Sequence, residues 1–217
     1  MKKLLLTVVL LFSCLGLYAY EKGQVSIGLG AIYSPIEIGT DYGEVNVDNT
    51  TIGDSHDAKL GKPGWGGELQ ALYFLNPRVG VGLSFSDQYF ASDLSSGWYV
   101  HNHARIQNYM AVGHIFLTPN SSFKLYIPLA IGAGHTVYTK DFSEKGDRKH
   151  HFSYTGFAYY AGVGVEKALS SHWNLGLEAR YNGNRFHASS TCRNGDHLTV
   201  YPRANFFSLI LRAIYTL

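Results

Sequence analysis

The last eleven residues, Phe207 to Leu217, read FSLILRAIYTL and carry the pattern that decides the fold. Every second side chain in this stretch is apolar: Phe207, Leu209, Leu211, Ala213, Tyr215 and Leu217. The positions between them include Ser208, Arg212 and Thr216, so the two faces of an extended chain differ in polarity. A tilted strand of about 9–11 residues is long enough to cross a bilayer. The segment therefore predicts a transmembrane β-strand.

The same alternation with a period of two recurs along the whole chain. In the segment 24–34, Val25, Ile27 and Leu29 alternate with small or polar residues. The strand near 105–118 is the least clear, because both of its faces are largely apolar. Together with the C-terminal strand we predict eight strands, and the other seven are 24–34, 64–75, 79–86, 105–118, 123–134, 154–166 and 173–181.

Long polar connections and short turns separate these strands in strict alternation. The long connections are 35–63, 88–104, 140–151 and 186–202. The short turns are Asn76–Arg78, Pro119–Ser122 and Ser170–His172. This order predicts an all-β fold, an eight-stranded antiparallel up-and-down transmembrane β-barrel, in which all the short turns lie at one rim. We accordingly expect both chain termini on the periplasmic side.

The composition of the polar face favours a membrane barrel over a water-soluble barrel such as a lipocalin. That face consists largely of glycine: Gly28, Gly30, Gly66, Gly80, Gly82, Gly132, Gly134, Gly156, Gly162, Gly164 and Gly176. Glycine covers the outside of a soluble barrel poorly, but small residues suit the narrow interior of an eight-stranded barrel. The apolar face carries aromatic residues, several near strand ends, where membrane barrels have their aromatic girdles: Trp65, Tyr73, Tyr159, Trp173, Tyr181 and Tyr215.

The N-terminus has the layout of a secretory signal peptide. Lys2 and Lys3 precede the apolar run Leu4–Phe12, and the small residue Ala19 follows as a cleavage site. We therefore expect a signal peptide at 1–19 and an outer-membrane barrel domain at 20–217. An alternative remains open, because the segment before Cys14 loosely resembles a lipobox in which this cysteine is acylated.

Charge and cysteine content restrict the possible partners. Removal of residues 1–19 takes two lysines away, so the formal charge changes from 18 minus 16, or +2, to 16 minus 16, or zero. There is no basic surplus that would attract nucleic acid, so we expect no nucleic-acid partner. Cys192 is then the one remaining cysteine, which excludes an intramolecular disulfide.

Three segments carry a resemblance to a known group of proteins. The segments are Leu129–Gly134, Trp173–Tyr181 and the C-terminal strand, in which Tyr215 stands two places before the apolar terminus. Together they resemble the small eight-stranded outer-membrane barrels of the OmpA-like, OmpW-like and opacity-protein group. The resemblance implies an integral protein of the bacterial outer membrane, surrounded by outer-membrane lipids. It also implies recognition of the C-terminal strand by the barrel assembly machinery, and we expect a monomer.

Six charged residues fall on the predicted inward face: Glu68, Lys124, Glu166, Glu178, Arg180 and Arg212. A charge that faces lipid at the midplane costs about 2–4 kcal/mol for arginine, so these residues should point inward. Inside they should pair, because an unpaired buried ion is costly. Counting along neighbouring strands favours Glu178 with Arg212 and Glu68 with Arg180. Such pairs either plug the barrel or form a gate whose exchange of partners opens a narrow path.

Seven histidines fall in the predicted connections: His56, His101, His103, His150, His151, His187 and His197. The pair His101 and His103 could present two imidazoles on one side of an extended segment, which metals tolerate. These histidines lack carboxylate or cysteine support, however, and ordinary solvated histidines are expected. We therefore predict no metal site and no cofactor.

An enzymatic alternative rests on His187 and Ser189. The element His187-Ala188-Ser189 is similar to the His-x-Ser element of lipid A 3-O-deacylases, whose catalytic triad also needs an acid. No aspartate or glutamate follows Asp196, so the final strand lacks an acidic partner. We therefore predict no enzyme. The expected function is that of a small pore or of a surface-exposed structural or interaction protein, with a surface adhesin as an alternative. A small solute or an extracellular ligand is the corresponding partner.

Overall fold

The computed structural model describes residues 19–41, 44–47, 50–54, 63–92, 99–142, 148–191 and 197–217. The segment assigned to the signal peptide lies outside these residues except for Ala19, and so does Cys14 of the alternative lipobox. His56, Cys192 and Asp196 also lie outside them. Among the described residues, no helix is long and apolar enough to cross a membrane.

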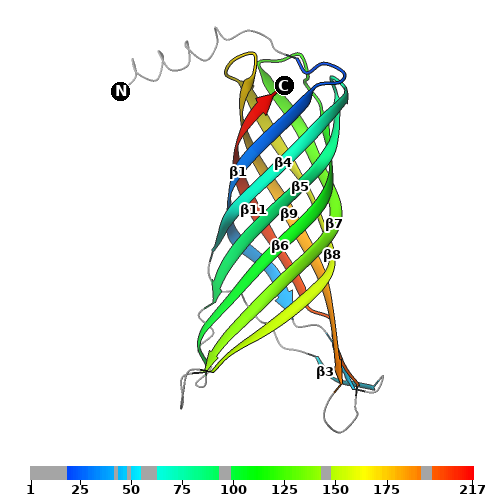
Figure 1. Ribbon diagram of the computed structural model, residues 1–217, viewed down its shortest axis with the longest axis vertical. Coiled ribbons are helices and arrows are strands. Elements are labelled where there is room, and N and C mark those ends of the chain that lie inside the picture. The colour runs from blue at the N-terminus through cyan, green and yellow to red at the C-terminus, as the bar shows by residue number, and fades with distance from the viewer. Residues whose placement is uncertain are drawn as a thin grey trace.

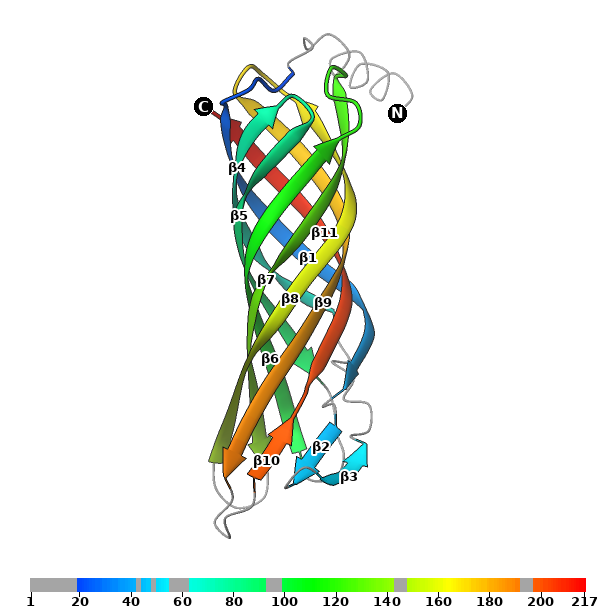
Figure 2. The ribbon, with the colours of Figure 1, turned by 90° about the vertical axis from the view of Figure 1, so that its right-hand side faces the viewer.

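Eight antiparallel strands close into a barrel (Figure 1). They are β1 (Val25–Asp41), β4 (Gly64–Asn76), β5 (Val79–Ser92), β6 (Tyr99–Phe116), β7 (Phe123–Phe142), β8 (Arg148–Ala168), β9 (Trp173–Thr191) and β11 (Arg203–Thr216). Each of these strands pairs with the one that precedes it in the chain. The last strand, β11, closes the barrel by pairing with both β1 and β9. The predicted all-β, eight-stranded up-and-down barrel is confirmed. The first described residues and the C-terminus lie at the rim of the short turns (Figures 1 and 2).

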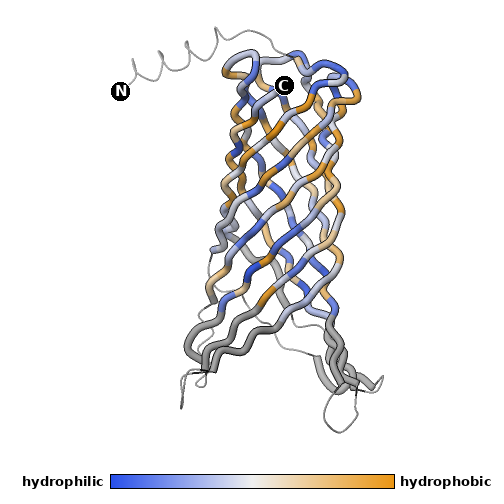
Figure 3. The backbone as a smooth tube through the Cα atoms, viewed as in Figure 1, coloured by the Kyte–Doolittle hydropathy of each residue, from blue (hydrophilic) through white to orange (hydrophobic). Residues whose placement is uncertain are grey.

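The pleat of β11 separates lipid-facing from interior side chains. Leu209 and Leu211 are 46% and 54% exposed, whereas Ser208 before them and Arg212 after them are each 1% exposed. The same alternation runs around the barrel as interleaved apolar and polar positions along each strand (Figure 3). An outer apolar band around a polar interior is the arrangement of a membrane barrel. The outward assignment of the aromatic residues holds for Trp65, Tyr73 and Trp173, which are 66%, 46% and 51% exposed.

The predicted connections were too long, because the strands continue well beyond the apolar band. β7 and β8 comprise 20 and 21 residues, about twice what a bilayer needs, and their ends occupy most of 140–151. The connection 88–104 contains the end of β5 and the start of β6. Three short strands lie in the remaining connections, β2 (Glu44–Val47) and β3 (Thr50–Asp54) in 35–63 and β10 (His197–Val200) in 186–202. Outside the membrane a ladder can be polar on both faces, so polarity there did not indicate a loop.

Two apolar clusters fill the barrel at different levels. The first, near the short turns, contains Phe74 and Phe116 close to the ends of β4 and β6. The second lies farther along the barrel, where Phe90 and Phe206 meet edge to face at 5.1 Å. The candidate site lies among polar side chains beyond Phe74 and Phe116, and Tyr126 and Tyr160 of the first cluster border it.

Candidate functional site

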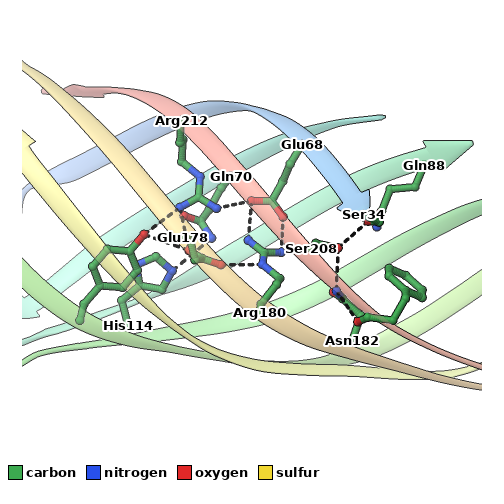
Figure 4. A network of polar contacts seen from close by, with 12 residues as sticks. Ser34, Glu68, Gln70, Gln88, His114, Glu178, Arg180, Asn182, Ser208 and Arg212 are labelled. Carbon is green, nitrogen blue, oxygen red and sulfur yellow. Dashed lines mark hydrogen bonds and ion pairs between the residues drawn. The ribbon is translucent and has the colours of Figure 1, made fainter. Parts of the chain in front are cut away.

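Four charged side chains meet in the middle of the barrel and form the interior charge cluster (Figure 4). Its members are Glu68 on β4, Glu178 and Arg180 on β9, and Arg212 on β11. All four side chains are at most 3% exposed. Two guanidinium groups face two carboxylates, so the cluster has no net charge. Buried ions of opposite sign thereby compensate one another, as the cost of burial requires.

Each arginine of the cluster contacts both glutamates. Arg180 donates from Nη1 to Glu68 Oε2 at 2.6 Å and from Nε to Glu178 Oε1 at 2.5 Å. Arg212 donates from Nη2 to Glu68 Oε1 at 2.6 Å and from Nη1 to Glu178 Oε2 at 3.1 Å. The four contacts close a ring across the barrel. Both pairs favoured by counting, Glu178 with Arg212 and Glu68 with Arg180, are among these contacts.

The strand register explains why Glu68 and Arg212 meet. Gly30 on β1 pairs with Glu68 on one side and with Arg212 on the other. Since glycine places no side chain between them, the carboxylate and the guanidinium reach one another over β1. Gly28 makes room for the arginine in the same way, because a Cβ atom there would lie 2.6 Å from Arg212 Cδ. Interior glycines thus provide the volume that the buried arginines occupy.

Aromatic side chains complete the surroundings of the interior charge cluster. Tyr126 donates its hydroxyl hydrogen to Glu178 Oε2 at 2.9 Å. The guanidinium of Arg180 lies 3.9 Å from the ring centroid of Tyr160, within the range of a cation–π contact. His114 stacks on Tyr126 with 4.6 Å between ring centroids. These contacts hold the charged groups in one arrangement.

The other two predicted interior charges, Lys124 and Glu166, lie near the short-turn rim. They are cross-strand neighbours on β7 and β8, and each is 1% exposed. Tyr20 inserts at the same place, where its hydroxyl donates to Glu166 Oε2 at 2.7 Å. Its ring stacks on Phe74 at 3.8 Å, and Lys124 Nζ lies 3.9 Å from the centre of the ring. Tyr20 and its neighbours therefore fill the interior near the short-turn rim.

A chain of uncharged polar side chains lies on the other side of the interior charge cluster (Figure 4). Ser34 donates to Gln88 Oε1 at 2.9 Å, and its hydroxyl lies 2.7 Å from that of Ser208. Asn182 donates to Ser208 Oγ at 2.9 Å. From one rim toward the other, the interior thus contains the Tyr20 region, the interior charge cluster, this polar chain and the second apolar cluster.

The residues of the enzymatic alternative are only partly described. His187 is exposed on β9, and its ring lies 5.2 Å from that of Tyr201. The side chains of Ser189 and Asp196 lie outside the described part of the chain.

The assignment of the histidines to loops was wrong for most of them, because the strands extend into the connections. His101 and His103 lie on β6, His150 and His151 on β8, His187 on β9 and His197 on β10. In the part of the chain that the structure describes, no group of three or more metal-ligating residues occurs.

Sequence reasoning missed two polar features. The first is His114, which lies 3.3 Å from Gln70 across the interior and which the alternation along β6 could have placed there. The second is a charged pair on the outer face, Asp87 with Arg105, at 2.5 Å. Arg105 opened the predicted strand 105–118 and Asp87 fell just beyond the predicted strand 79–86, so the contact between them depends on the register of β5 and β6.

The closed barrel, its outer apolar band and its charge-paired interior define an integral β-barrel membrane protein. The chain belongs to the outer membrane protein beta-barrel domain family, whose profile matches residues 5–209. It is therefore an integral protein of the bacterial outer membrane.

Solved structures of small outer-membrane barrels resemble the chain. OprG from Pseudomonas aeruginosa has a TM-score of 0.56 at 14% identity, covering 92% of this chain and 98% of that chain. Neisserial surface protein A has a TM-score of 0.47 at 12% identity, covering 87% of this chain and 98% of that chain. The attachment invasion locus protein Ail of Yersinia pestis has a TM-score of 0.45 at 16% identity, covering 86% of this chain and 99% of that chain. At these identities the likeness concerns the fold alone. No curated protein is significantly similar in sequence.

Proposed function

We propose that this protein is a closed outer-membrane barrel that acts through its surface, as a structural or interaction protein, and is neither an open pore nor an enzyme. The observation that carries the proposal is the ring of four contacts in the interior charge cluster, at 0–3% exposure. An eight-stranded barrel has an interior that side chains can fill completely. The apolar clusters on either side of the ring add to the closure.

We further propose that the short turns and both termini face the periplasm. In outer-membrane barrels the short turns lie on that side and the longer connections face outward. The extended ends of β5 to β9 then project from the cell surface. Among the β7 side chains that the structure describes, the last large apolar one that is strongly exposed is Ile131, at 61%, yet the strand continues to Phe142. This projecting part is the surface on which an extracellular ligand would bind, and an adhesin is one form of this function.

A conductance measurement tests the closed-barrel proposal. Purified protein inserted in a planar lipid bilayer should show no steady current above the baseline, because the interior is filled at several levels. Discrete, long-lived openings of the unmodified protein would contradict it.

A gated pore is the second candidate function. It is favoured by the fact that each arginine of the interior charge cluster contacts both glutamates, so that partners can exchange without leaving a charge unpaired. In that case substitution of one arginine should change the current, whereas a simple plug predicts no change.

The hydrolase alternative, with His187 and Ser189, has its own test. Mass spectrometry of lipid A from cells that express the protein should show unchanged acyl chains if the barrel is not an enzyme. A lost acyl chain that returns when Ser189 is replaced by alanine would establish the hydrolase.

A further inference from the structure

A charged pair lies on the outer face of the barrel, where apolar side chains dominate. Asp87 on β5 and Arg105 on β6 join through Arg105 Nη2 and Asp87 Oδ2 at 2.5 Å and through Nε and Oδ1 at 2.9 Å. The side chain of Arg105 is 57% exposed and that of Asp87 is 31% exposed. Charges on the lipid face are costly unless they lie near the interface, so this pair marks a position near the edge of the apolar band.

The pair lines a hollow of about 420 Å³, which we call the upper pocket. Its other walls are Trp65, Gly66, Gly67 and Tyr89. Gly67 leaves the hollow open, because a Cβ atom there would meet its nearest neighbour, Gly30 O, only at 3.7 Å. The indole of Trp65 is 66% exposed, lies beside the charges and has its ring 5.9 Å from that of Tyr89.

A second hollow, the lower groove, lies on the same three strands and has a volume of about 440 Å³. Its outward side chains are apolar: Leu69, Ala71, Leu83, Phe85, Tyr109 and Ala111. The register makes it continuous with the upper pocket. Gly67 pairs with Asp87, and the next outward pair toward the short turns is Leu69 with Phe85. A polar pocket thus passes directly into an apolar groove that runs toward the short-turn rim.

The upper pocket and the lower groove together form one strip on the outer face. Two levels of aromatic side chains indicate how deep this strip lies in the membrane. Tyr33, Trp65 and Tyr89 are neighbours in the register of β1, β4 and β5 and mark the level nearer the extended ends. Tyr73 marks the other level, eight residues farther along β4. At about 3.3 Å per residue and a tilt of about 35–45°, the two levels are roughly 20 Å apart, close to the height of the apolar band. The upper pocket therefore lies at head-group depth, and the lower groove lies beneath it in the hydrocarbon.

We propose that the strip binds one molecule of a phosphorylated glycolipid of the outer leaflet, with its sugar–phosphate head in the upper pocket and an acyl chain in the lower groove. The proposal rests on the orientation with the short turns toward the periplasm. Within the described part of the chain, Asp87 engages Nε and Nη2 of Arg105, and Nη1 keeps both hydrogens for a phosphate. The carboxylate of Asp87 accepts hydrogen bonds from sugar hydroxyl groups, and Trp65 offers its face to the sugar ring.

The chemistry of the strip favours this lipid over other occupants. A second copy of the chain would have to bury the half-exposed ion pair against an apolar outer face, which is costly. A lipid with a phosphate but no sugar would leave the exposed indole of Trp65 without a sugar ring and would add no hydrogen bond to Asp87, whose carboxylate already accepts from Arg105. A phosphorylated sugar that carries acyl chains can contact all four features at once: its phosphate binds Arg105, its sugar contacts Asp87 and Trp65, and an acyl chain fills the lower groove.

The test uses the full-length mature protein, refolded in detergent and titrated with lipid A, with bound lipid counted by native mass spectrometry. One lipid per protein is expected at saturation. Arg105→Gln should raise the Kd about ten-fold or more, because hydrogen bonds to charged groups are lost. Gly67→Leu should weaken binding as well, because its side chain fills the upper pocket.

Matched variants serve as controls for folding and position. Gly113→Leu places the same side chain on the outer face of β6, where a Cβ atom meets nothing within 4 Å, and should bind like the wild type. Arg185→Gln removes a partly exposed arginine from β9, outside the strip, and should also leave the Kd unchanged. The β-sheet circular dichroism spectrum of each variant shows whether it has folded.

Comparison of three lipids shows whether both the phosphate and the sugar contribute to binding. Lipid A without its phosphates and phosphatidylglycerol without a sugar should both bind more weakly than lipid A. Wild-type affinity in folded Arg105→Gln and Gly67→Leu would overturn the proposal, and so would equal binding of the three lipids. These outcomes leave the closed-barrel proposal intact, since that proposal depends on conductance and not on lipid binding.

Discussion

Arg212 Nη2 lies 2.6 Å from Glu68 Oε1, although the two residues are 144 positions apart in the chain. The contact passes over Gly30, the β1 residue that pairs with both of them. It joins the last strand of the barrel to β4 through the interior. The interior charge cluster therefore forms only when β11 has closed the barrel.

Removal of Arg212 should destabilise the barrel strongly. Arg212→Met leaves Glu68 and Glu178 with one arginine for two buried carboxylates, and breaking a buried pair costs about 3–5 kcal/mol. Urea unfolding of the protein in lipid vesicles measures the change in the free energy of unfolding. The double variant Arg212→Met with Glu178→Gln should recover part of the loss, since one carboxylate then loses its charge. Equal stability of Arg212→Met and the wild type would contradict the central role of the interior charge cluster.

Conductance should separate a plug from a gate. Arg180→Ala and Arg212→Ala should both keep the baseline current of the wild type, because apolar clusters close the barrel on either side of the interior charge cluster. Planar-bilayer recordings of protein with a native circular dichroism spectrum provide the measurement. New discrete openings in either variant would favour the gated pore.

Interior glycines should tolerate no large side chain. Gly28→Leu should lower the yield of folded barrel, because a Cβ atom there would already lie 2.6 Å from Arg212 Cδ. Gly113→Leu adds the same side chain on the outer face, where nothing lies within 4 Å, and should fold normally. Refolding into lipid vesicles, followed by protease protection, measures the yield. Similar yields for the two variants would show that the interior can expand.

Tyr20 should stabilise the short-turn end of the barrel in two separable ways. Tyr20→Phe keeps the ring stacked on Phe74 but leaves Glu166 without its 2.7 Å hydrogen bond, which should cost about 1–3 kcal/mol. Tyr20→Ala also creates a cavity and should cost roughly 3–5 kcal/mol. Urea unfolding of both variants measures which of them loses more unfolding free energy. A larger loss of unfolding free energy in Tyr20→Phe than in Tyr20→Ala would contradict this explanation.

The periodicity of the sequence predicted the barrel well and its outer ends poorly. Between the aromatic levels, lipid and packed interior act on opposite faces of each strand, so apolar and polar residues must alternate, and this pattern is local in the sequence. Beyond the membrane both faces of a strand can be polar, which is why 140–151 was interpreted as a connection although β7 and β8 continue through it. The outer pair Asp87 and Arg105 was missed for a different reason, because local alternation does not show which residues of two neighbouring strands face one another.

The sequence by itself determined that the chain forms transmembrane strands, which face of each strand meets lipid, and that charged residues such as Arg212 point inward. These properties follow from a period of two and from the cost of a charge in hydrocarbon, which need no knowledge of neighbouring strands. Only the tertiary structure decided which charges meet. Partners come from strands far apart in the chain, and their levels depend on the tilt and shear of the closed barrel. The ring of Glu68, Glu178, Arg180 and Arg212 exists because closure brings β4, β9 and β11 around the same interior space.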